Sequence, residues 1–506
     1  MAATGIHESL WLDTFDWKQK YPKLTTDITA EICVVGAGIS GLTVAYLLQK
    51  AGKKVILVEA GNIGSGETAR TTAHLASALD DGFAHLKKLF GIDGLRLALQ
   101  SHQEAIDFIA NLTKKEKIDC DFAWLEGYLF PTTDEEAAEL QKEAEVLAEV
   151  NVLKAQFKKL PIAKLSRYQS LVFAKQGQFH PLKYLAGLSK RFSSMGGEIF
   201  TNTYINEVKE KGEATILTTR DGRCIGAQYA VITTNTPFND KVTMHTKQAA
   251  YRSYAVGLEI AKGVIPTALY WDMHQPYHYV RIYERKDQTS DILIVGGEDH
   301  KTGQDDNSEK RFLDLIQWAQ TYFSNLGVCR YRWSGQIIEP VDSLAFIGLN
   351  PGDKRTFIAT GDSGHGLTHG TIAGQLISDL ILKRNNPWEK LYQPARKNWW
   401  AACEFAQENL NVAKQYLDTI SPGEVKNSKV IAPGEGAVIR KGIKKIAVYR
   451  NKQGKLQKLS AVCPHLGCIV KWNKAETTWD CPCHGSRFNA QGEVLNGPAH
   501  TNLEKL

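Results

Sequence analysis

A glycine-rich turn between two apolar strands is the feature of this 506-residue sequence that most restricts its fold. The apolar run Glu31–Val35 leads into Gly36–Gly41 (GAGISG), and an apolar helical segment follows through Leu48. A second apolar run, Val55–Val58, ends at the acidic residue Glu59. In such a unit the glycines allow a tight turn, close approach of a pyrophosphate and tight helix–strand packing, and the helix N-terminus attracts the phosphates. The unit therefore predicts an α/β fold of the Rossmann type with a dinucleotide site.

The acid that ends this unit and three further segments indicate which dinucleotide is bound. Glu59 lies where a carboxylate usually binds the ribose hydroxyls, and it would repel the 2′-phosphate of NADP. Residues 61–74 are rich in small and hydroxyl side chains that can run close under a pyrophosphate and a ribityl chain. Phe357–Gly366 is a strand and glycine loop before an expected helix over Thr371–Leu382, and Tyr229–Asn235 is expected to be a strand of the same domain. These pieces favour FAD. The candidate cofactor contacts are Gly36, Gly38, Ile39, Ser40, Gly41, Glu59, Ala60, Arg70, Thr71, Thr72, Gly361, Asp362, Gly364 and Gly366.

Two short loops near the C-terminus contain four cysteines and two histidines. The first is Cys463–Cys468 (CPHLGC) and the second is Cys481–Ser486 (CPCHGS). Thiolates hold iron–sulfur clusters, and imidazoles can replace two of them on one iron. A Cys₂His₂ zinc site and a pair of structural disulfides are the alternatives, although the spacings usual for zinc are absent. The pattern therefore favours a [2Fe–2S] cluster.

These loops resemble the cluster site of the disulfide-bearing Rieske proteins of respiratory chains. The resemblance implies that Cys463 and Cys481 bind one iron, and that His465 and His484 bind the other. The cysteines left over, one in each loop, would form the disulfide Cys468–Cys483.

Two positions after the second loop concern the reduction potential of the cluster. The resemblance implies that Ser486 donates a hydrogen bond to a bridging sulfide. The family often has a tyrosine two residues later, where this sequence has Phe488. Hydrogen bonds to cluster sulfurs raise the potential. The missing hydroxyl thus predicts a potential below that of the tyrosine-bearing relatives.

The nucleotide-binding segments together resemble the D-amino-acid oxidase/glycine oxidase superfamily of FAD oxidoreductases over most of Thr26–Lys383. Proteins in which this flavin module precedes a Rieske domain form a recognisable group, and the sequence is similar to them along nearly its whole length. The resemblance implies that Val208 contacts the adenine. It also implies that residues 247–330, which alternate in strand fashion, form a sheet that covers the flavin ring and builds the substrate pocket.

Three side chains near the expected pocket are the candidate catalytic residues. Tyr279 and Arg281 have the same strand parity, so both are expected on one face of the sheet. Arg281 fits a position where an arginine clamps a substrate carboxylate by a bidentate pair, with a structural or surface arginine as the alternative. His365, between two glycines, is a candidate for flavin contact. Further candidates for lining the pocket are Tyr251, Tyr254 and His278.

The implied fold class is α/β plus all-β. A Rossmann-like FAD-binding domain is interrupted by an α+β substrate domain and followed by a small antiparallel Rieske β domain. The predicted segments are an N-terminal extension (1–27), a discontinuous FAD-binding domain (28–80, 170–246 and 331–384), a substrate domain (81–169 and 247–330), a helical connector (385–424) and the Rieske domain (425–506).

Composition and charge exclude some classes of partner. The sequence is 43% hydrophobic and 23% charged, as is ordinary for a globular protein. A net charge of +6 is small for this length, so nucleic-acid binding is not indicated. Residues 1–20 have no continuous apolar core, which argues against a signal peptide. The longest apolar stretch, Ile32–Leu48, is interrupted by glycines and falls short of a membrane span. A cytoplasmic protein without a transmembrane segment is expected.

The two cofactors together indicate a redox enzyme. A flavin accepts two electrons as hydride, whereas an iron–sulfur cluster passes electrons singly. The leading interpretation is a dehydrogenase or demethylase of an amine or amino acid, which passes electrons from FAD to the cluster and on to an external one-electron acceptor protein. One alternative is reverse flow, in which an external donor feeds FAD through the cluster for a reductive or oxygen-activating reaction. Another is a non-catalytic electron-transfer or redox-sensing protein.

Overall fold

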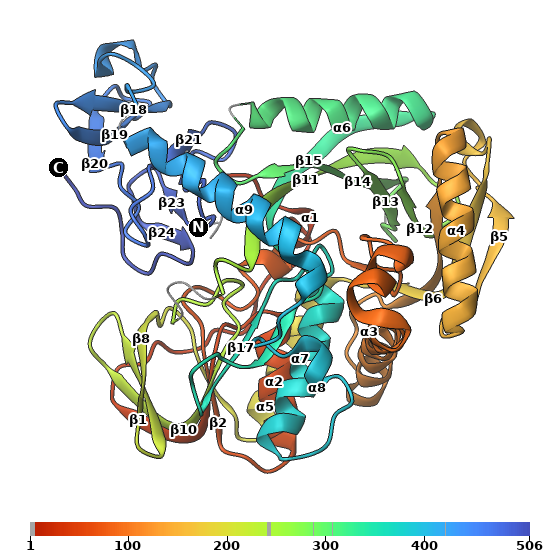
Figure 1. Ribbon diagram of the computed structural model, residues 1–506, viewed down its shortest axis with the longest axis horizontal. Coiled ribbons are helices and arrows are strands. Elements are labelled where there is room, and N and C mark those ends of the chain that lie inside the picture. Colours follow the sequence, from red (N-terminus) through yellow and green to blue (C-terminus); the bar gives the residue numbers. More distant parts are fainter. Residues whose placement is uncertain (1–5, 240–243, 287, 306, 420) are drawn as a thin grey trace.

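The computed structural model describes residues 6–239, 244–286, 288–305, 307–419 and 421–506. Two large β-sheets form the body, and a smaller C-terminal module of two short sheets, blue in Figure 1, packs against one end of it. Helices cover the large sheets, whereas the C-terminal module is built from antiparallel strands. The predicted α/β plus all-β fold class is confirmed.

The first large sheet contains the glycine-rich unit. In spatial order its main strands are β16 (Phe346–Leu349), β17 (Thr356–Thr360), β10 (Cys224–Ile232), β1 (Ile28–Val35), β2 (Val55–Val58) and β7 (Glu198–Phe200), and the hairpin of β8 (Ile205–Lys211) and β9 (Ala214–Thr219) pairs with β10. The strands from β17 to β7 are parallel. Successive residues at the end of β1 belong to different hydrophobic clusters, because Ile32 and Val34 face one side of the sheet and Cys33 and Val35 face the other. Burial on both faces explains why these strands read as continuous apolar runs.

Three helices pack on one face of this sheet: α2 (Ile39–Lys50), α5 (Pro181–Ser194) and α7 (Gly366–Ile381). Helices α2 and α7 approach each other closely, since a Cβ atom at Gly374 of α7 would lie 2.2 Å from Thr43 Cγ2 of α2. Helix α7 begins at Gly366, directly after the glycine loop, and so starts earlier than the predicted Thr371.

The second large sheet is mainly antiparallel. Its strands, in spatial order, are β15 (Leu326–Pro340), β11 (Gln248–Ala261), β14 (Ser290–Lys301), β13 (His278–Tyr283), β12 (Leu269–Asp272), β4 (Ala123–Phe130), β6 (Gln169–Gln178) and β3 (His74–Leu75), with β5 (Ala155–Lys159) also paired to β6. The helices beside it are α3 (Phe83–Glu116), α4 (Asp134–Val150) and α6 (Ser308–Tyr322).

Two of the expected domain boundaries cut strands of this second sheet. The segment expected to begin at residue 170 starts inside β6, and the segment expected to begin at residue 331 starts inside β15. Both strands pair with neighbours of the second sheet over most of their length. The chain therefore returns to the first sheet only after these strands end.

The C-terminal module consists of two small antiparallel sheets. One is formed by β18 (Gly436–Lys441), β19 (Lys444–Arg450) and β20 (Leu456–Ser460), and the other by β21 (Lys471–Asn473), β22 (Thr478–Asp480), β23 (Arg487–Asn489) and β24 (Val494–Asn496). The last residues complete the first of these sheets, because Lys505 pairs with Leu459 and the Ser460 N–H donates to the Glu504 carbonyl (2.8 Å).

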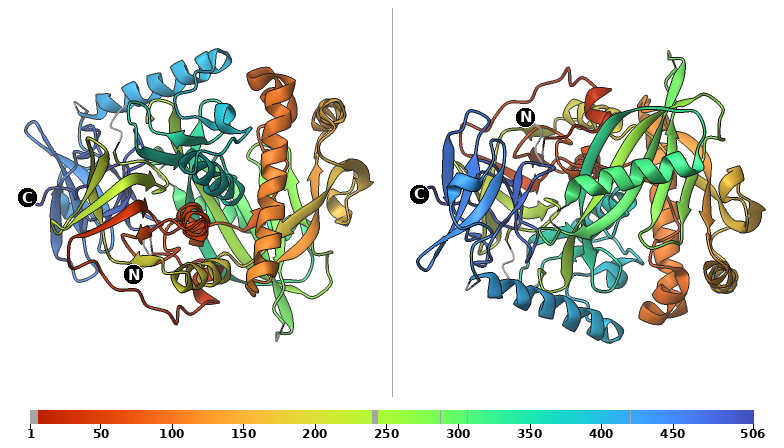
Figure 2. Two further views of the ribbon diagram at one scale, coloured as in Figure 1. Left: turned by 90° about the horizontal axis from the view of Figure 1, so that it is seen from below. Right: turned by 90° about the horizontal axis from the view of Figure 1, so that it is seen from above.

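A helical connector links the body to this module. It contains α8 (Glu389–Tyr392) and α9 (Ala402–Gln415), and α9 runs along the body toward the module in all three views (Figures 1 and 2). Just after α9, the Tyr416 hydroxyl donates to the Leu466 carbonyl in the first cysteine loop (2.8 Å). Among the described residues, no helix combines the length and apolar character needed to cross a bilayer.

Candidate dinucleotide cavity and iron–sulfur centre

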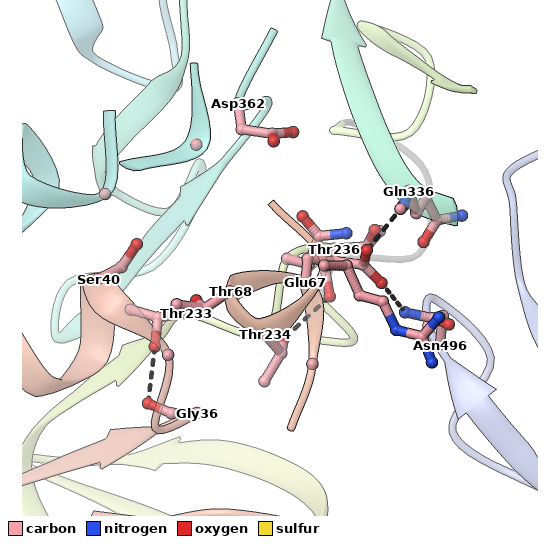
Figure 3. Close-up of a pocket in the computed structure, with 18 of the residues that line it drawn as sticks. Gly36, Ser40, Glu67, Thr68, Thr233, Thr234, Thr236, Gln336, Asp362 and Asn496 are labelled. Atoms are coloured by element: carbon pink, nitrogen blue, oxygen red, sulfur yellow. Dashed lines mark hydrogen bonds between the residues drawn. The ribbon is translucent and has the colours of Figure 1, made fainter. Parts of the chain in front are cut away.

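A cavity of about 820 Å³ lies where the two large sheets and the C-terminal module meet. Figure 3 shows part of it, with residues from all three regions around one space. The predicted residues that line it are Gly36, Gly38, Ile39, Ser40, Glu59, Ala60, Arg70, Thr71, Thr72, Gly361, Asp362, Gly364, Gly366, Tyr279 and His365. Segments near residues 36–72 and 361–366, far apart in the sequence, thus line the same cavity.

The glycine-rich turn is shaped by close backbone contacts. Gly36 has a φ of +103°, and a Cβ atom there would lie 2.7 Å from the Thr233 carbonyl oxygen. A Cβ atom at Gly41 would lie 1.8 Å from the Gly36 carbonyl oxygen. Gly41 does not line the cavity; it lets helix α2 approach the turn. These contacts leave the N-terminus of α2 open toward the cavity, as a pyrophosphate requires.

Glu59 supports this turn from the end of β2. Its Oε2 accepts a hydrogen bond from the Ala37 N–H (2.8 Å), and its Oε1 accepts one from the Gly61 N–H (2.7 Å). Burial raises the pKa of this carboxyl, although these backbone donors act in the opposite direction. A carboxylate at the cavity wall, beside a glycine turn with no obstructing side chain, fits the ribose and pyrophosphate of a dinucleotide.

The N-terminus of helix α7 also borders the cavity, beside that of α2, since a Cβ atom at Gly370 of α7 would lie 2.7 Å from Ser40 Oγ of α2. Asp362 Oδ1 accepts from the Ile338 N–H (2.9 Å), and burial raises the pKa of Asp362 to about 6. His365, the N-cap residue, lies with Nε2 3.3 Å from Asp80 Oδ2. Burial alone would lower the pKa of His365, but the Asp80 carboxylate, together with Asp81 and Asp362, raises it, and the net shift is upward. Two helix N-termini therefore point into one cavity.

Aromatic and acidic residues line the end of the cavity that lies on the second sheet. The Tyr279 hydroxyl is 3.0 Å from Ser253 Oγ, and Tyr277, which also lines the cavity, donates its hydroxyl to Asp299 (2.9 Å). Burial, together with the nearby Asp80 and Glu298 carboxylates, raises the pKa of Asp299 to about 6. This end is negative and aromatic in character.

Arg281 does not face the cavity, so its expected role as a carboxylate clamp is not supported. Its guanidinium donates to the backbone carbonyls of Thr72 (3.2 Å) and Ala73 (2.8 Å) and lies 5.4 Å from the Trp11 ring. Burial lowers its pKa to about 9. The side chain is buried and links β13 to the loop of residues 61–73, the flavin-side loop, part of which lines the cavity. This is a structural role.

Val208 also lies away from the cavity. It pairs with Leu217 of β9 and packs against the hydrophobic cluster of the first sheet, whereas Ile205, at the start of β8, lines the cavity. The cavity lining does not include Val208, so its adenine contact stays a prediction without support from this lining. Among the further candidates, Tyr254 lines the cavity, but Tyr251 and His278 do not.

The two loops with cysteine and histidine share a backbone arrangement. In the first loop the Gly467 N–H donates to the Cys463 carbonyl, and in the second the Gly485 N–H donates to the Cys481 carbonyl, both at 3.0 Å. Gly467 and Gly485 have positive φ values of 84° and 77°. Each loop is thus a closed turn that begins at its cysteine.

The expected ligand side chains of the two loops face one another. The ring centroids of His465 and His484 are 5.0 Å apart, with the rings nearly perpendicular (88°). The thiols of Cys463 and Cys481 lie within hydrogen-bonding reach of each other, and backbone N–H groups of both loops point at the two sulfurs. Two sulfurs and two imidazoles from opposed loops are the donor set of a Rieske-type cluster, so these residues fit that group.

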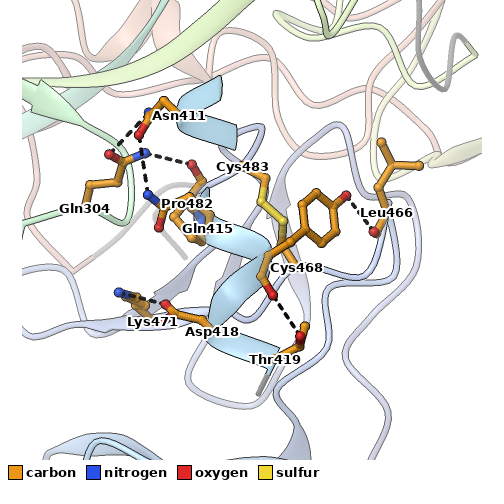
Figure 4. Close-up of a disulfide and its surroundings, with 11 residues drawn as sticks. Gln304, Asn411, Gln415, Asp418, Thr419, Leu466, Cys468, Lys471, Pro482 and Cys483 are labelled. Carbon is orange, nitrogen blue, oxygen red and sulfur yellow. Dashed lines mark hydrogen bonds and ion pairs between the residues drawn. A yellow bond between two sulfur atoms is a disulfide. The ribbon is translucent and has the colours of Figure 1, made fainter. Parts of the chain in front are cut away.

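Cys468 and Cys483 are joined in the expected disulfide, which ties the two loops together (Figure 4). The sulfurs of Cys468, Cys481 and Cys483 lie within 4.8 Å of one another. Because two of these three are bonded to each other, the trio does not supply three separate thiolates. The geometry thus favours the cysteine–histidine set over a thiolate-only metal site.

The residues after the second loop lie against the ligand cysteines. Ser486 interacts through its hydroxyl with the Cys463 sulfur and accepts a hydrogen bond from the Ala499 N–H (3.0 Å). Phe488 is fully buried in the same hydrophobic cluster as Cys463 and Cys481. Ser486 is therefore suited to donate to a sulfur at the cluster, whereas Phe488 brings no donor there.

Two residues of the body, His245 and Gln336, contact the cluster loops and were not expected from the sequence. The His245 ring centroid is 4.7 Å from that of His465 and 5.8 Å from that of His484. Gln336 of β15 lines the cavity and donates its side-chain amide to the Gly485 carbonyl (2.7 Å). They meet the loops only through packing of segments distant in sequence, so no local pattern marks them.

Comparison with known proteins agrees with this arrangement. The family model described as FAD dependent oxidoreductase matches residues 31–380, and the Rieske [2Fe-2S] domain model matches residues 421–506. YhfW, a candidate Rieske 2Fe-2S iron–sulfur protein of Bacillus subtilis, is 31% identical over 99% of this chain and 97% of its own length. Gamma-glutamylputrescine oxidoreductase of Escherichia coli is 25% identical over 71% of this chain and 85% of its own length.

Among solved structures, glycine oxidase from Geobacillus kaustophilus has the same fold over 73% of this chain and 99% of its own length, with a TM-score of 0.61 and 18% identity. The segments matched by the two family models contain the glycine turn, most of the cavity lining and both cysteine loops. These matches confirm both family resemblances drawn from the sequence, and with them the two cofactors, FAD and a [2Fe-2S] cluster. The chain belongs to the family of FAD-dependent oxidoreductases, and its C-terminal module is a Rieske [2Fe-2S] domain.

Proposed function

We propose that the protein oxidises a carbon–nitrogen bond of a small amine or amino acid and passes the electrons through the Rieske cluster to an external one-electron acceptor protein. When bound, FAD would supply a hydride acceptor in the cavity. Loss of hydride from the carbon next to nitrogen of a neutral amine leaves an iminium ion, which water hydrolyses to a carbonyl compound and a protonated amine. The two electrons would then leave in single steps through the cluster. The proposed ligands are Cys463, Cys481, His465 and His484.

The contact between the cavity wall and the second cluster loop carries this proposal. The Gln336 side chain lines the cavity, and its amide donates to the carbonyl of Gly485, the residue that follows His484. Close packing supports the same path, since a Cβ atom at Gly485 would lie 2.3 Å from the Ala250 Cβ of β11. A cluster held against the cavity in this way is suited to exchanging electrons with a flavin inside the same molecule.

Carboxylates in and behind the cavity wall, only one of which, Asp80, is paired with a histidine (His365), favour an amine without a carboxylate. Asp80 and Asp362 line the cavity, and Asp299 lies behind Tyr277, whereas Arg281 is committed to backbone carbonyls. Negative groups in these positions attract an alkylammonium and repel a carboxylate. The printed name of the Escherichia coli relative, an oxidoreductase of gamma-glutamylputrescine, is consistent with an amine substrate.

An anaerobic screen tests this function and the direction of electron flow. Matched pairs such as N-methylisoamylamine and N-methylleucine, which share a skeleton but differ in the carboxylate, would be mixed with the oxidised protein. We expect the amine member to bleach the flavin absorbance and then to produce the electron paramagnetic resonance signal of a reduced cluster. Flavin bleaching with a cluster that stays oxidised would contradict outward transfer, and a set of amines without any effect would contradict C–N oxidation.

A further inference from the structure

The wall of the dinucleotide cavity includes a segment of the Rieske module. The lining residues from this module are Glu493, Val494, Leu495, Asn496, Gly497, Ala499 and Asn502. They belong to strand β24, the residue before it and the loop that follows it. A Cβ atom at Gly497 would lie 3.6 Å from the Thr236 carbonyl oxygen, so the segment is packed against the first sheet's side of the cavity. The cavity is therefore complete only when the two modules are docked.

A hydrogen bond from this segment holds the loop that leads to the flavin site. Glu67 begins the short 3₁₀ helix Glu67–Ala69, and both of its carboxylate oxygens are used (Figure 3). Asn496 of the Rieske module donates its side-chain amide to Oε1 (2.9 Å), and the Gln336 N–H of β15 donates to Oε2 (2.7 Å). Glu67 is thus the joint between the flavin-side loop, the second sheet and the Rieske module.

The effect of Glu67 reaches the N-terminus of helix α2 through the next residue. Thr68 Oγ1 accepts a hydrogen bond from the Ile39 N–H (3.2 Å), in the first turn of α2. It also lies 2.9 Å from where a Cβ atom at Gly38 would be. The hydrogen bond from Asn496 fixes Glu67, and through it the neighbouring Thr68, whose side chain borders the expected pyrophosphate site.

A second contact is made at the other end of the same wall. Arg220 follows strand β9, lines the cavity and donates to the His500 carbonyl of the Rieske module (3.2 Å). Its guanidinium lies 3.8 Å from the ring of Tyr204, which also lines the cavity. The Rieske segment thus contacts the β8–β9 side of the cavity as well as the flavin-side loop.

From these contacts we propose that the Rieske module is part of the FAD-binding site, with the segment 493–502 closing the cavity and Asn496 acting as a positioning residue through Glu67. Linkage requires reciprocity: a module that strengthens FAD binding when docked must itself be held more firmly when FAD is bound. Bound FAD would therefore stabilise the docked arrangement of the two modules. This role does not depend on the substrate or on the direction of electron flow.

The test measures FAD affinity in the full-length protein. Apoprotein carrying Asn496→Ala is titrated with FAD and followed by flavin fluorescence. Because the lost hydrogen bond ends on a charged group, we expect Kd to rise about tenfold. Asn427→Ala is the matched control, since this exposed asparagine lies in the same module, accepts a hydrogen bond from the nearby Lys429 N–H and is not among the residues that line the cavity. Its Kd should equal that of the unmodified protein.

An exchange of donor and acceptor separates a specific contact from a folding defect. Asn496→Asp alone would place two carboxylates together and should raise Kd. Adding Glu67→Gln restores one donor and one acceptor, since the introduced amide can donate to the aspartate and its oxygen can still accept from the Gln336 N–H. We expect the double variant to recover most of the lost affinity.

Protease digestion within the connector gives a readout that is independent of affinity. Saturating FAD should slow cleavage between the modules in the unmodified protein, and less so in Asn496→Ala. An Asn496→Ala protein that binds FAD as tightly as Asn427→Ala would overturn the proposal, as would a double variant without any recovery. Both results would leave the proposed C–N oxidation intact, because neither readout involves substrate.

Discussion

At the scale of single residues, two glycines at equivalent places in the cluster loops differ in their surroundings. Gly467 and Gly485 both have positive φ, so any other residue brings similar backbone strain to either position. In the described part of the chain, no atom lies within 4 Å of a Cβ atom at Gly467. A Cβ atom at Gly485 would lie 2.3 Å from the Ala250 Cβ and 2.6 Å from Gln336 Nε2. Alanine at either glycine would add similar backbone strain, but only at Gly485 would it also clash with residues of the body. Comparing the two variants therefore isolates the effect of the contact between modules.

Gly485→Ala is predicted to slow electron transfer from flavin to cluster, whereas Gly467→Ala is not. The added methyl group in the second loop must push it away from β11, and crowding of this kind costs about 1–3 kcal/mol. Stopped-flow absorbance after anaerobic reduction of the flavin would measure the rate of cluster reduction in both variants. Equal rates would show that the contact with Ala250 and Gln336 has no part in the transfer.

Phe488→Tyr is predicted to raise the reduction potential of the cluster. The side chain is buried in the same hydrophobic group of residues as the two ligand cysteines, and the family resemblance puts a tyrosine with a hydrogen bond to the iron–sulfur cluster at this position. A hydrogen bond of about 1 kcal/mol corresponds to about 40 mV for a one-electron couple. A redox titration followed by circular dichroism would measure the shift. Phe488→Leu, which adds no donor, is the control, and an equal potential in all three proteins would contradict this reasoning.

Sequence reasoning succeeded at residues whose role is set by their neighbours in the chain. The spacing of Cys463 and His465, and the glycines of Gly36–Gly41, indicated the two cofactors because a loop or turn fixes their geometry locally. Arg281 shows the limit. Strand parity correctly put it on the face of Tyr279, but parity does not reveal that nearby carbonyls take up the guanidinium. The contact of Gln336 with the second cluster loop could not be predicted, because it forms when two modules distant in sequence dock.

At the scale of elements, the approach of helix α2 to the glycine turn decides whether the cavity can hold a dinucleotide. Gly41→Ala is predicted to weaken FAD binding, because its Cβ atom would overlap the Gly36 carbonyl oxygen at 1.8 Å and drive the helix away. Crowding of a packed site costs about 1–3 kcal/mol, which is a loss of about tenfold or more in affinity. Gly52→Ala, with nothing within 4 Å of its Cβ, serves as a control in the turn after the same helix.

The measurement is the flavin content of the purified protein together with FAD titration of the apoprotein. Full occupancy in Gly41→Ala would show that the helix does not need to approach the turn so closely.

Elements were predictable from hydrophobic pattern where their own residues decide the outcome. Helix α4 spans Asp134–Val150, where the buried Leu140 and Leu147 recur at helical spacing, and the Thr133 side chain accepts from the Glu136 N–H (3.1 Å) at its start. Helix α7 began earlier than predicted, at Gly366, since packing against α2 tolerates glycines that propensity alone disfavours. The membership of β6 and β15 in the second sheet depended on pairing partners far along the chain, which a local pattern does not specify.

At the scale of the whole molecule, a buried ionic group joins the Rieske module to the second sheet. Glu476, between β21 and β22, lies 3.6 Å from Arg252 of β11, and both side chains are fully buried. Ser334 of β15 donates its hydroxyl to Glu476. Burial alone would raise the pKa of Glu476, but the contact with His7 and the nearby Arg252, Arg70 and Arg487 guanidiniums lower it to about 2. Removing one partner would leave buried charge without compensation.

Glu476→Gln is therefore predicted to destabilise the protein at pH 7 by about 3–5 kcal/mol. The native pKa is depressed below the unfolded value of about 4.3, so the contribution of the carboxylate is complete above that pH and is lost as pH falls toward 2. Urea unfolding followed by tryptophan fluorescence at pH 7 and pH 3 would measure it. The deficit of Glu476→Gln should shrink at pH 3.

Glu504→Gln, at an exposed carboxylate of the same module, should show little difference from the unmodified protein at either pH. A Glu476→Gln deficit that stayed constant between pH 7 and pH 3 would mean that this carboxylate does not titrate as an ion-paired group.

Electron transfer within one molecule can be tested most directly by the rate constant of cluster reduction, after anaerobic reduction of the flavin by an amine, as protein concentration is varied. Because the cluster loop contacts the cavity wall within one molecule, we predict a first-order rate constant that is independent of protein concentration. A rate constant that rises in proportion to protein concentration, as electron exchange between separate molecules would give, would contradict it.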